Sequence, residues 1–235
     1  MREENIDSGL DLSIFNPYYI YSIDMLLQET YKGNLMSVYS LDEFVTDCER
    51  QVTDNALLSD TVHGIVPLMQ RLLPNADQFL NAEHFQSDPD HYARNLVFDD
   101  EKSGLSLYTL VWNPGQWTPV HDHGTWGVVG IIEGRLDEQS YLRVDSGQTS
   151  TRDDNIELQR SSLVLLSPGS ISTFVPNPDH IHRTGCVENG SRCVSLHLYG
   201  RAMNSFYAYD LDEGTRALIE VAHKKTRPGE NEKSE

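Results

Sequence analysis

The first part of the chain carries apolar residues at the spacing of amphipathic helices. Ser40 or Asp42 can cap a first helix. Its apolar side chains recur at helical spacing, at Leu41, Phe44, Val45 and Cys48. A second helix is predicted over 59–73, ended by Pro74. Its apolar face comprises Val62, Ile65, Val66, Met69 and Leu72. A third helical piece covers 76–80.

The pattern changes after Tyr92, where short β-rich runs are separated by Gly, Pro, Asn and Asp. Strands are predicted over 94–98, 105–112, 118–123, 126–133, 136–144, 156–160, 163–166, 172–176, 180–186 and 193–198. Strands this frequent, without intervening helices, favour a mainly β fold. We predict a double-stranded β-helix, or jelly-roll, barrel with an N-terminal helical region.

These patterns divide the chain into four regions of a single domain. We expect an N-terminal extension over 1–40 and a helical region packed on the barrel over 41–90. The barrel itself is predicted over 91–212, and the end of a C-terminal helix with a disordered, charged tail over 213–235.

Charge and composition exclude several classes of partner. The net charge of -18 argues against nucleic acid and against anionic membranes, which both attract basic proteins. No stretch approaches the roughly 20 apolar residues of a membrane span, and the N-terminus lacks a signal-peptide pattern. Three cysteines form no disulfide pattern, which favours a cytoplasmic protein. The sequence does not indicate an oligomeric state.

A candidate metal site lies in the stretch between Gly115 and Gly134. His121 and His123 stand two residues apart in a predicted strand, so both imidazoles face the same side. The glycine and histidine spacing resembles the first cupin motif, whose usual Glu is replaced here by Gly127. This combined pattern predicts a metal held by both histidines.

A third histidine ligand is expected in the segment that follows Ser167-Pro168-Gly169. His182 and His180 both lie there, two residues apart. A strand-face argument cannot separate them, because positions i and i+2 point to the same side.

Polar and apolar residues alternate in the run from Cys193 to Tyr199. Ser195, His197 and Tyr199 share one face of the predicted strand. If that face is inside the barrel, the three side chains form a hydrogen-bonded row that aims a phenol into the cavity. Alternation alone is equally compatible with a solvated outer face.

Together these motifs resemble the cysteine dioxygenase family of thiol dioxygenases, in its bacterial type. The resemblance covers roughly 42–199 and includes the segment around Arg94. It implies Fe(2+) held by three histidines, His121, His123 and His182. It also implies a small thiol and O2 as partners. Ser195, His197 and Tyr199 would form a hydrogen-bonded row next to the metal ligands without binding the metal. Arg94 would bind the substrate carboxylate, a role that suits its planar guanidinium.

Two departures from the family pattern bear on cross-linking and substrate. Gly127 stands where mammalian-type enzymes carry a Cys, so we predict no Cys–Tyr cross-link. Enzymes acting on 3-mercaptopropionate usually replace Arg94 by Gln and carry a later arginine, where this chain has Ala208. Arg201 is the nearest basic residue.

Several functional hypotheses remain at this stage. L-cysteine is the expected substrate, with 3-mercaptopropionate or a related thiol acid as the alternative. A surface salt bridge is the alternative role for Arg94. Three histidines also suit zinc. A non-catalytic metal- or ligand-binding cupin, and a zinc hydrolase or isomerase, are therefore alternatives of other classes.

Overall fold

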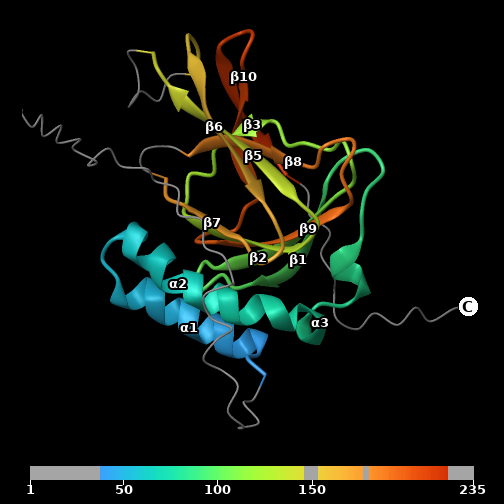
Figure 1. The fold of residues 1–235 in the computed structure, drawn as a ribbon. Coiled ribbons are helices and arrows are strands. Elements are labelled where there is room, and N and C mark those ends of the chain that lie inside the picture. Colours follow the sequence, from blue (N-terminus) through green and yellow to red (C-terminus); the bar gives the residue numbers. More distant parts are fainter. Residues whose placement is uncertain (1–37, 146–152, 177–179, 222–235) are drawn as a thin grey trace, which may run out of the picture.

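The helical prediction for the N-terminal region is confirmed. The structure is a computed structural model that describes residues 38–145, 153–176 and 180–221 (Figure 1). Helix α1 (Leu41–Asp54) begins at Ser40, whose hydroxyl accepts a hydrogen bond from the Glu43 backbone while the Glu43 carboxylate accepts one from the Ser40 backbone. The expectations for 1–37 and for the tail beyond 221 lie outside the described residues.

Helix α2 (Leu58–Leu72) buries the whole predicted face. The helix ends at Leu72, close to the predicted end, but Pro74 does not stop the helical path. It lies in a short 3-10 helix that follows α2 directly. Three short elements therefore link α2 to the barrel: η2 (Leu73–Asn75), α3 (Ala76–Phe79) and η3 (Ala82–Phe85).

Eleven described strands form two antiparallel sheets. The five-stranded sheet has the order β1 (Ala93–Asp99), β2 (Ser106–Trp112), β9 (Cys193–Tyr199), β4 (Gly127–Glu133), β7 (Ile171–Phe174). The six-stranded sheet has the order β11 (Thr215–Glu220), β10 (Ser205–Asp210), β3 (Val120–His121), β8 (Ile181–Gly185), β5 (Leu136–Arg143), β6 (Leu158–Leu166). This architecture confirms the predicted mainly β barrel fold with N-terminal helices.

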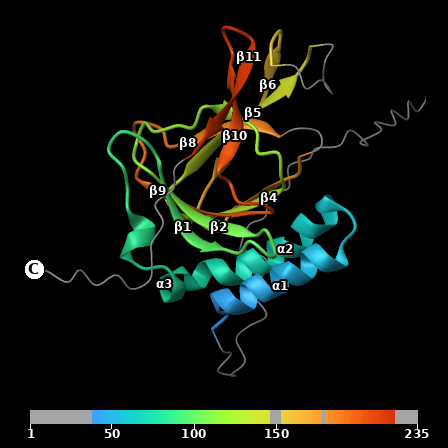
Figure 2. The ribbon, with the colours of Figure 1, turned by 180° about the vertical axis from the view of Figure 1, so that it is seen from behind.

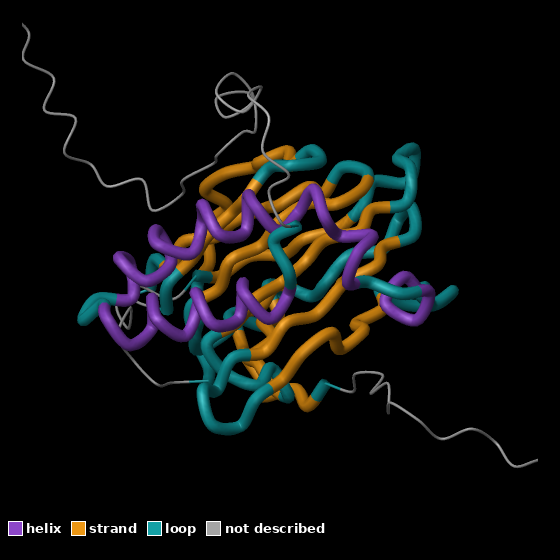
Figure 3. Tube along the Cα trace, turned by 90° about the horizontal axis from the view of Figure 1, so that it is seen from below, coloured by secondary structure: helices purple, strands orange, loops and turns teal. Residues whose placement is uncertain are grey.

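The helices cover the outer face of the five-stranded sheet, as Figure 3 shows from below. Apolar residues of α1 and α2 pack there against Leu196 and Leu198 of β9 and Val128 of β4. Because side chains alternate along a strand, the other face of β9 points between the two sheets. The face that carries Ser195, His197 and Tyr199 is therefore inside the barrel, and these three residues are at most 4% exposed.

Several strand boundaries differ from the predicted ones. β3 ends at His121, so His123 lies in the loop after it, and β6 is one strand where two were predicted. The helix end predicted after residue 212 is wrong, because Thr215–Glu220 pairs with β10 as a β-hairpin. This hairpin (red in Figure 2) lies on the side of the barrel away from α1 and α2.

None of the described helices has the length and apolar character that crossing a membrane requires.

Candidate metal centre and surrounding cavity

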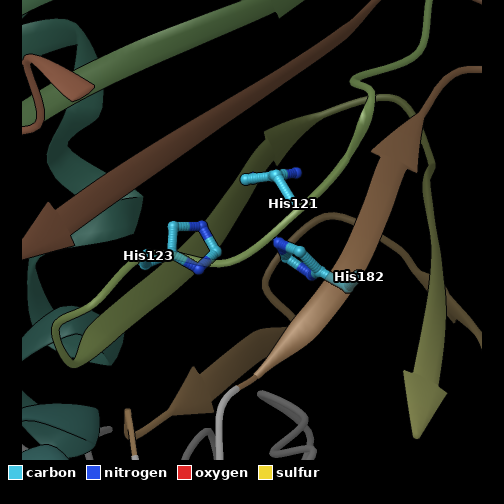
Figure 4. Close-up of side chains that lie close together, drawn as sticks. All are labelled: His121, His123 and His182. Atoms are coloured by element: carbon cyan, nitrogen blue, oxygen red, sulfur yellow. The ribbon is translucent and has the colours of Figure 1, made fainter. Parts of the chain in front are cut away.

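Three histidines from β3, from the loop after it and from β8 meet inside the barrel. His121 of β3 pairs directly with His182 of β8, and His123 follows two residues after His121. Their ring centroids lie 4.7 to 4.9 Å apart, and one ligand atom from each lies within 4.8 Å of the others. Figure 4 shows the three imidazoles facing a common point. The structure thus groups His182, not His180, with His121 and His123.

The imidazoles are in the protonation state that a metal ligand requires. Burial, followed by the neighbouring imidazoles, lowers the pKa of His121 and His123 well below the ordinary value, and burial also lowers the pKa of His182. Neutral rings keep one lone pair each. The Nδ1 atom of His121 lies 3.0 Å from the Pro119 carbonyl oxygen. The Nδ1 atom of His182 lies 2.8 Å from the Glu138 carboxylate. Both acceptors require an Nδ1 proton, which leaves each Nε2 available as a ligand.

The third imidazole is held by ring stacking. The His123 ring stacks on Phe174 at 4.2 Å, and Phe174 stacks in turn on His180 at 4.8 Å. The Nδ1 of His123 is buried and has no hydrogen-bond partner among the described residues. A buried nitrogen of His123 without a hydrogen-bond partner among the described residues, next to the unprotonated Nε2 atoms of His121 and His182, fits a bound metal ion.

Gly127 makes room for the ring that holds His123. A Cβ atom at this position would lie 2.3 Å from Cζ of Phe174, a distance that real side chains do not adopt. The cupin carboxylate position is therefore filled by an aromatic ring from β7. Gly127 brings no thiol, and Cys48, Cys186 and Cys193 are free cysteines.

Gly127→Ala is expected to destabilise the protein and to weaken metal binding together. The new methyl group must displace Phe174 and so disturb the stacking on His123, at an overpacking cost of about 1–3 kcal/mol. Thermal unfolding of the metal-free protein and metal titration measure the two effects. Adding Phe174→Leu to Gly127→Ala should restore stability beyond that of the single variant. A Gly127→Ala protein as stable as the parent would contradict this packing argument.

A hydrogen-bonded row extends along the inner face of β9. Ser195 Oγ lies 2.8 Å from His197 Nε2, and His197 Nδ1 lies 3.0 Å from the Tyr199 hydroxyl. The indole N–H of Trp112 donates to Ser195 Oγ at 3.1 Å, a contact that the sequence did not reveal. Burial, with a contribution from Arg94, lowers the pKa of His197 to about 3, and burial raises that of Tyr199. Both are therefore neutral at pH 7.

Arg94 is a buried cation that has no carboxylate partner among the described residues. It is only 8% exposed, its Nη2 donates to the Met203 carbonyl at 3.0 Å, and its guanidinium lies 4.9 Å from the Tyr108 ring centroid. Its Nη1 is buried without a hydrogen-bond partner, and none of the salt bridges between described residues includes it. The surface salt bridge that the sequence left open is absent from the described part of the chain.

Arg201 has a different environment. Four hydrogen bonds run from its guanidinium to backbone carbonyls: two to His123, one to Ala202 and one to Ser205. A guanidinium has five N–H donors, so little capacity remains for a ligand. Arg201 thus anchors the loop after His123 and has little capacity left to bind a carboxylate.

Glu138 is a buried carboxylate that sequence reasoning missed. It lies on β5, is 3% exposed, and contacts His182 and His180. Burial by itself would raise its pKa, but the close contacts with His180 and His182 hold the pKa well below its usual range. Strand alternation with Leu136 and Ser140, both fully buried, was the available signal for an inward carboxylate.

These groups share one cavity between the sheets. Its lining brings together the three clustered histidines, Arg94, and His197 and Tyr199 of β9, with apolar walls from both sheets. The lining residues include Tyr92, Arg94, His121, His123, Leu136, Glu138, Phe174, His182, His197, Tyr199, Met203 and Phe206. A cavity with this mixture suits a small anionic ligand bound beside a metal.

Comparison with known protein families finds one matching model, described as Cysteine dioxygenase type I, over residues 50–212. The human cysteine dioxygenase type 1 is 25% identical over 146 residues, which cover 61% of this chain and 68% of the human protein. The Rattus norvegicus cysteine dioxygenase type 1 is 25% identical over 140 residues, which cover 59% of this chain and 66% of the rat protein.

The solved structures that match this chain include two cupins. A cupin 2 domain-containing protein from Halorhodospira halophila matches with a TM-score of 0.38 and 14% identity, covering 55% of this chain and 77% of that chain. A cupin-like protein from Thermotoga maritima matches with a TM-score of 0.36 and 13% identity, covering 57% of this chain and 84% of that chain.

Proposed function

Because the chain belongs to the cysteine dioxygenase type I family, we propose that it is an iron-dependent thiol dioxygenase that converts L-cysteine to cysteine sulfinate. Both atoms of one O2 molecule end on the sulfur, which loses four electrons as O2 gains four. The thiol proton is released, and no further reductant is needed. The human relative is a cysteine dioxygenase, which supports L-cysteine as the thiol.

The observation that carries this proposal is the meeting of three kinds of group in one cavity. Neutral imidazoles, a guanidinium that has no carboxylate partner among the described residues, and a buried phenol all line it. A protein that only stores or senses a metal has no need of the last two, so this combination favours an enzyme over a non-catalytic cupin.

His121, His123 and His182 would hold the metal through ring nitrogens. Three histidine ligands suit iron and zinc alike, and the family supports iron. Bound ferrous iron would supply a site for the thiolate and for O2, and the redox chemistry between them. The surrounding residues bind the substrate, orient it and control protons.

Arg94 is suited to bind the substrate carboxylate. A buried guanidinium needs an anionic partner, and none of the described residues supplies one to its Nη1. A carboxylate can accept hydrogen bonds from a guanidinium in the fork geometry of the two groups. This contact would place the substrate between Arg94 and the three histidines, which line the same cavity.

The β9 row is suited to direct the Tyr199 proton into the cavity. The Trp112 N–H can only donate, so Ser195 Oγ accepts from it. Ser195 is fully buried and has His197 Nε2 as its remaining described partner, so its hydroxyl donates there. His197 then carries its proton on Nδ1 and donates to the Tyr199 oxygen. The Tyr199 hydroxyl keeps its own proton to donate to substrate or oxygen.

3-Mercaptopropionate has the same thiol and carboxylate and differs from cysteine by lacking the α-amine. Arg94 would serve either carboxylate. The alternative route through Arg201 has little support, because its donors already bind backbone carbonyls.

Oxygen uptake tests the proposal. Anaerobically iron-loaded protein, supplied with L-cysteine and 3-mercaptopropionate in parallel, is expected to consume oxygen faster with cysteine and to form cysteine sulfinate. Zinc-loaded protein is the matched control and should consume none. Faster turnover of 3-mercaptopropionate would support the thiol dioxygenase reaction but contradict L-cysteine as the preferred substrate. Absence of uptake with both thiols would contradict the enzyme proposal.

A further inference from the structure

Glu138 occupies a position behind the histidine cluster that the reaction itself does not use. Its Oε1 lies 2.8 Å from His182 Nδ1 and 3.2 Å from His180 Nε2. Its Oε2 accepts a hydrogen bond from Ser172 Oγ at 3.2 Å. Strands β5, β7 and β8 therefore all contribute to fixing this one carboxylate.

The contact determines which nitrogen of His182 faces the other two histidines. A carboxylate accepts hydrogen bonds and donates none, so the proton of His182 sits on Nδ1. The lone pair is then on Nε2, at the opposite edge of the ring. The main chain does the same for His121 through the Pro119 carbonyl, but with a neutral acceptor.

Glu138 also places a negative charge close to the histidine cluster. The three clustered imidazoles are neutral, so a divalent cation between them would carry its whole charge into a buried site. Gly127 replaces the carboxylate that the cupin motif usually places among the ligands. Glu138 supplies a negative charge from another strand, one imidazole away from the cluster.

We propose that Glu138 is a positioning residue that fixes the Nε2 lone pair of His182 and places a compensating negative charge behind the metal centre. The inference deepens the proposed function, on which it rests for the identity of the metal as iron. Hydrogen bonds of this kind tighten metal binding because they orient the ring and make it a stronger donor.

Metal affinity is the first test. The apparent dissociation constants of full-length protein for Zn2+ and, under anaerobic conditions, for Fe2+ are measured by competition with a chromophoric chelator. Glu138→Gln keeps an acceptor for Nδ1 but loses the charge, and Glu138→Ala loses both. We expect about 10-fold weaker binding for the Gln variant and about 100-fold for the Ala variant, within the range of such contacts.

Asp137 provides a matched control. It is the neighbouring carboxylate on β5, is also buried at 5% exposed, and pairs with Arg135 at 2.8 Å instead of with a histidine. Asp137→Asn should keep metal affinity within about threefold of the parent, well short of the effect of a lost histidine contact. Glu138 variants that also stay within about threefold would overturn the inference.

The tautomer of His182 is a second readout that does not depend on activity. Nitrogen NMR of the zinc-loaded parent protein is expected to show the His182 proton on Nδ1. A proton on Nε2 would overturn the inference even if Glu138→Ala failed to fold. If His180→Ala abolished metal binding while His121→Ala retained it, the carboxylate would be a direct ligand, which overturns the positioning role. Affinity and tautomer are independent of thiol oxidation, so this inference and the proposed function fail separately.

Discussion

His121→Ala is expected to abolish metal binding and oxygen uptake together. The ring centroid of His121 lies 4.7 Å from that of His123 and 4.8 Å from that of His182. Two of the three clustered histidines remain after the substitution, and both are buried. We expect metal affinity to fall by more than the 10–100-fold that an outer contact costs. Turnover of L-cysteine should fall to background.

Metal content by mass spectrometry and oxygen uptake on the same samples measure this prediction. His63→Ala is the control, because His63 lies on α2, outside the five-stranded sheet. A His121→Ala protein that keeps stoichiometric metal and normal turnover would place the metal elsewhere. The group of Glu138, His180 and His182 would then be the first alternative, since its ligand atoms also lie within 4.8 Å of one another.

Arg94→Gln is expected to lower kcat/KM for L-cysteine by about 30- to 4000-fold, chiefly through KM. Truncating one partner of a buried, hydrogen-bonded charge pair costs about 2–5 kcal/mol, and each 1.4 kcal/mol is a factor of ten. The glutamine can retain the hydrogen bond to the Met203 carbonyl, so the change acts mainly on the charge. Initial-rate oxygen uptake over a range of cysteine concentrations measures it.

Cysteamine separates a carboxylate contact from a general packing defect. It carries the thiol and the amine of cysteine but no carboxylate, so Arg94→Gln should change its turnover little. Equal losses for cysteine and cysteamine would mean that Arg94 supports the cavity and does not bind substrate. Unchanged turnover of cysteine would remove Arg94 from the proposed site altogether.

The spacing of His121 and His123 predicted that the two side chains meet, and the structure groups them with His182, although His123 lies in the loop after β3. The sequence left the orientation of β9 open, since alternation is the same for an inner and an outer polar face. Packing decided that question: α1 and α2 cover Leu196 and Leu198, so Ser195, His197 and Tyr199 face the cavity.

Features that depend on distant partners were not predictable in this way. The segment 215–220 contains Leu, Ala and Glu, which suit a helix, yet it pairs with β10 as an edge strand. Arg201 was a candidate for the substrate carboxylate until its hydrogen bonds to the backbone were visible. The contacts of Glu138 could not be predicted, because His180 and His182 lie more than 40 residues further along the chain.

The close fit of Gly127 and Phe174 has an evolutionary consequence. The aromatic ring occupies the space that any side chain at 127 would need. A lineage can therefore gain a cysteine or a glutamate at this position only after the residue at 174 has become smaller, and the two positions should change as a pair. In this family, a cysteine that forms a Cys–Tyr cross-link from β4 should then occur together with a smaller residue at the matching position of β7.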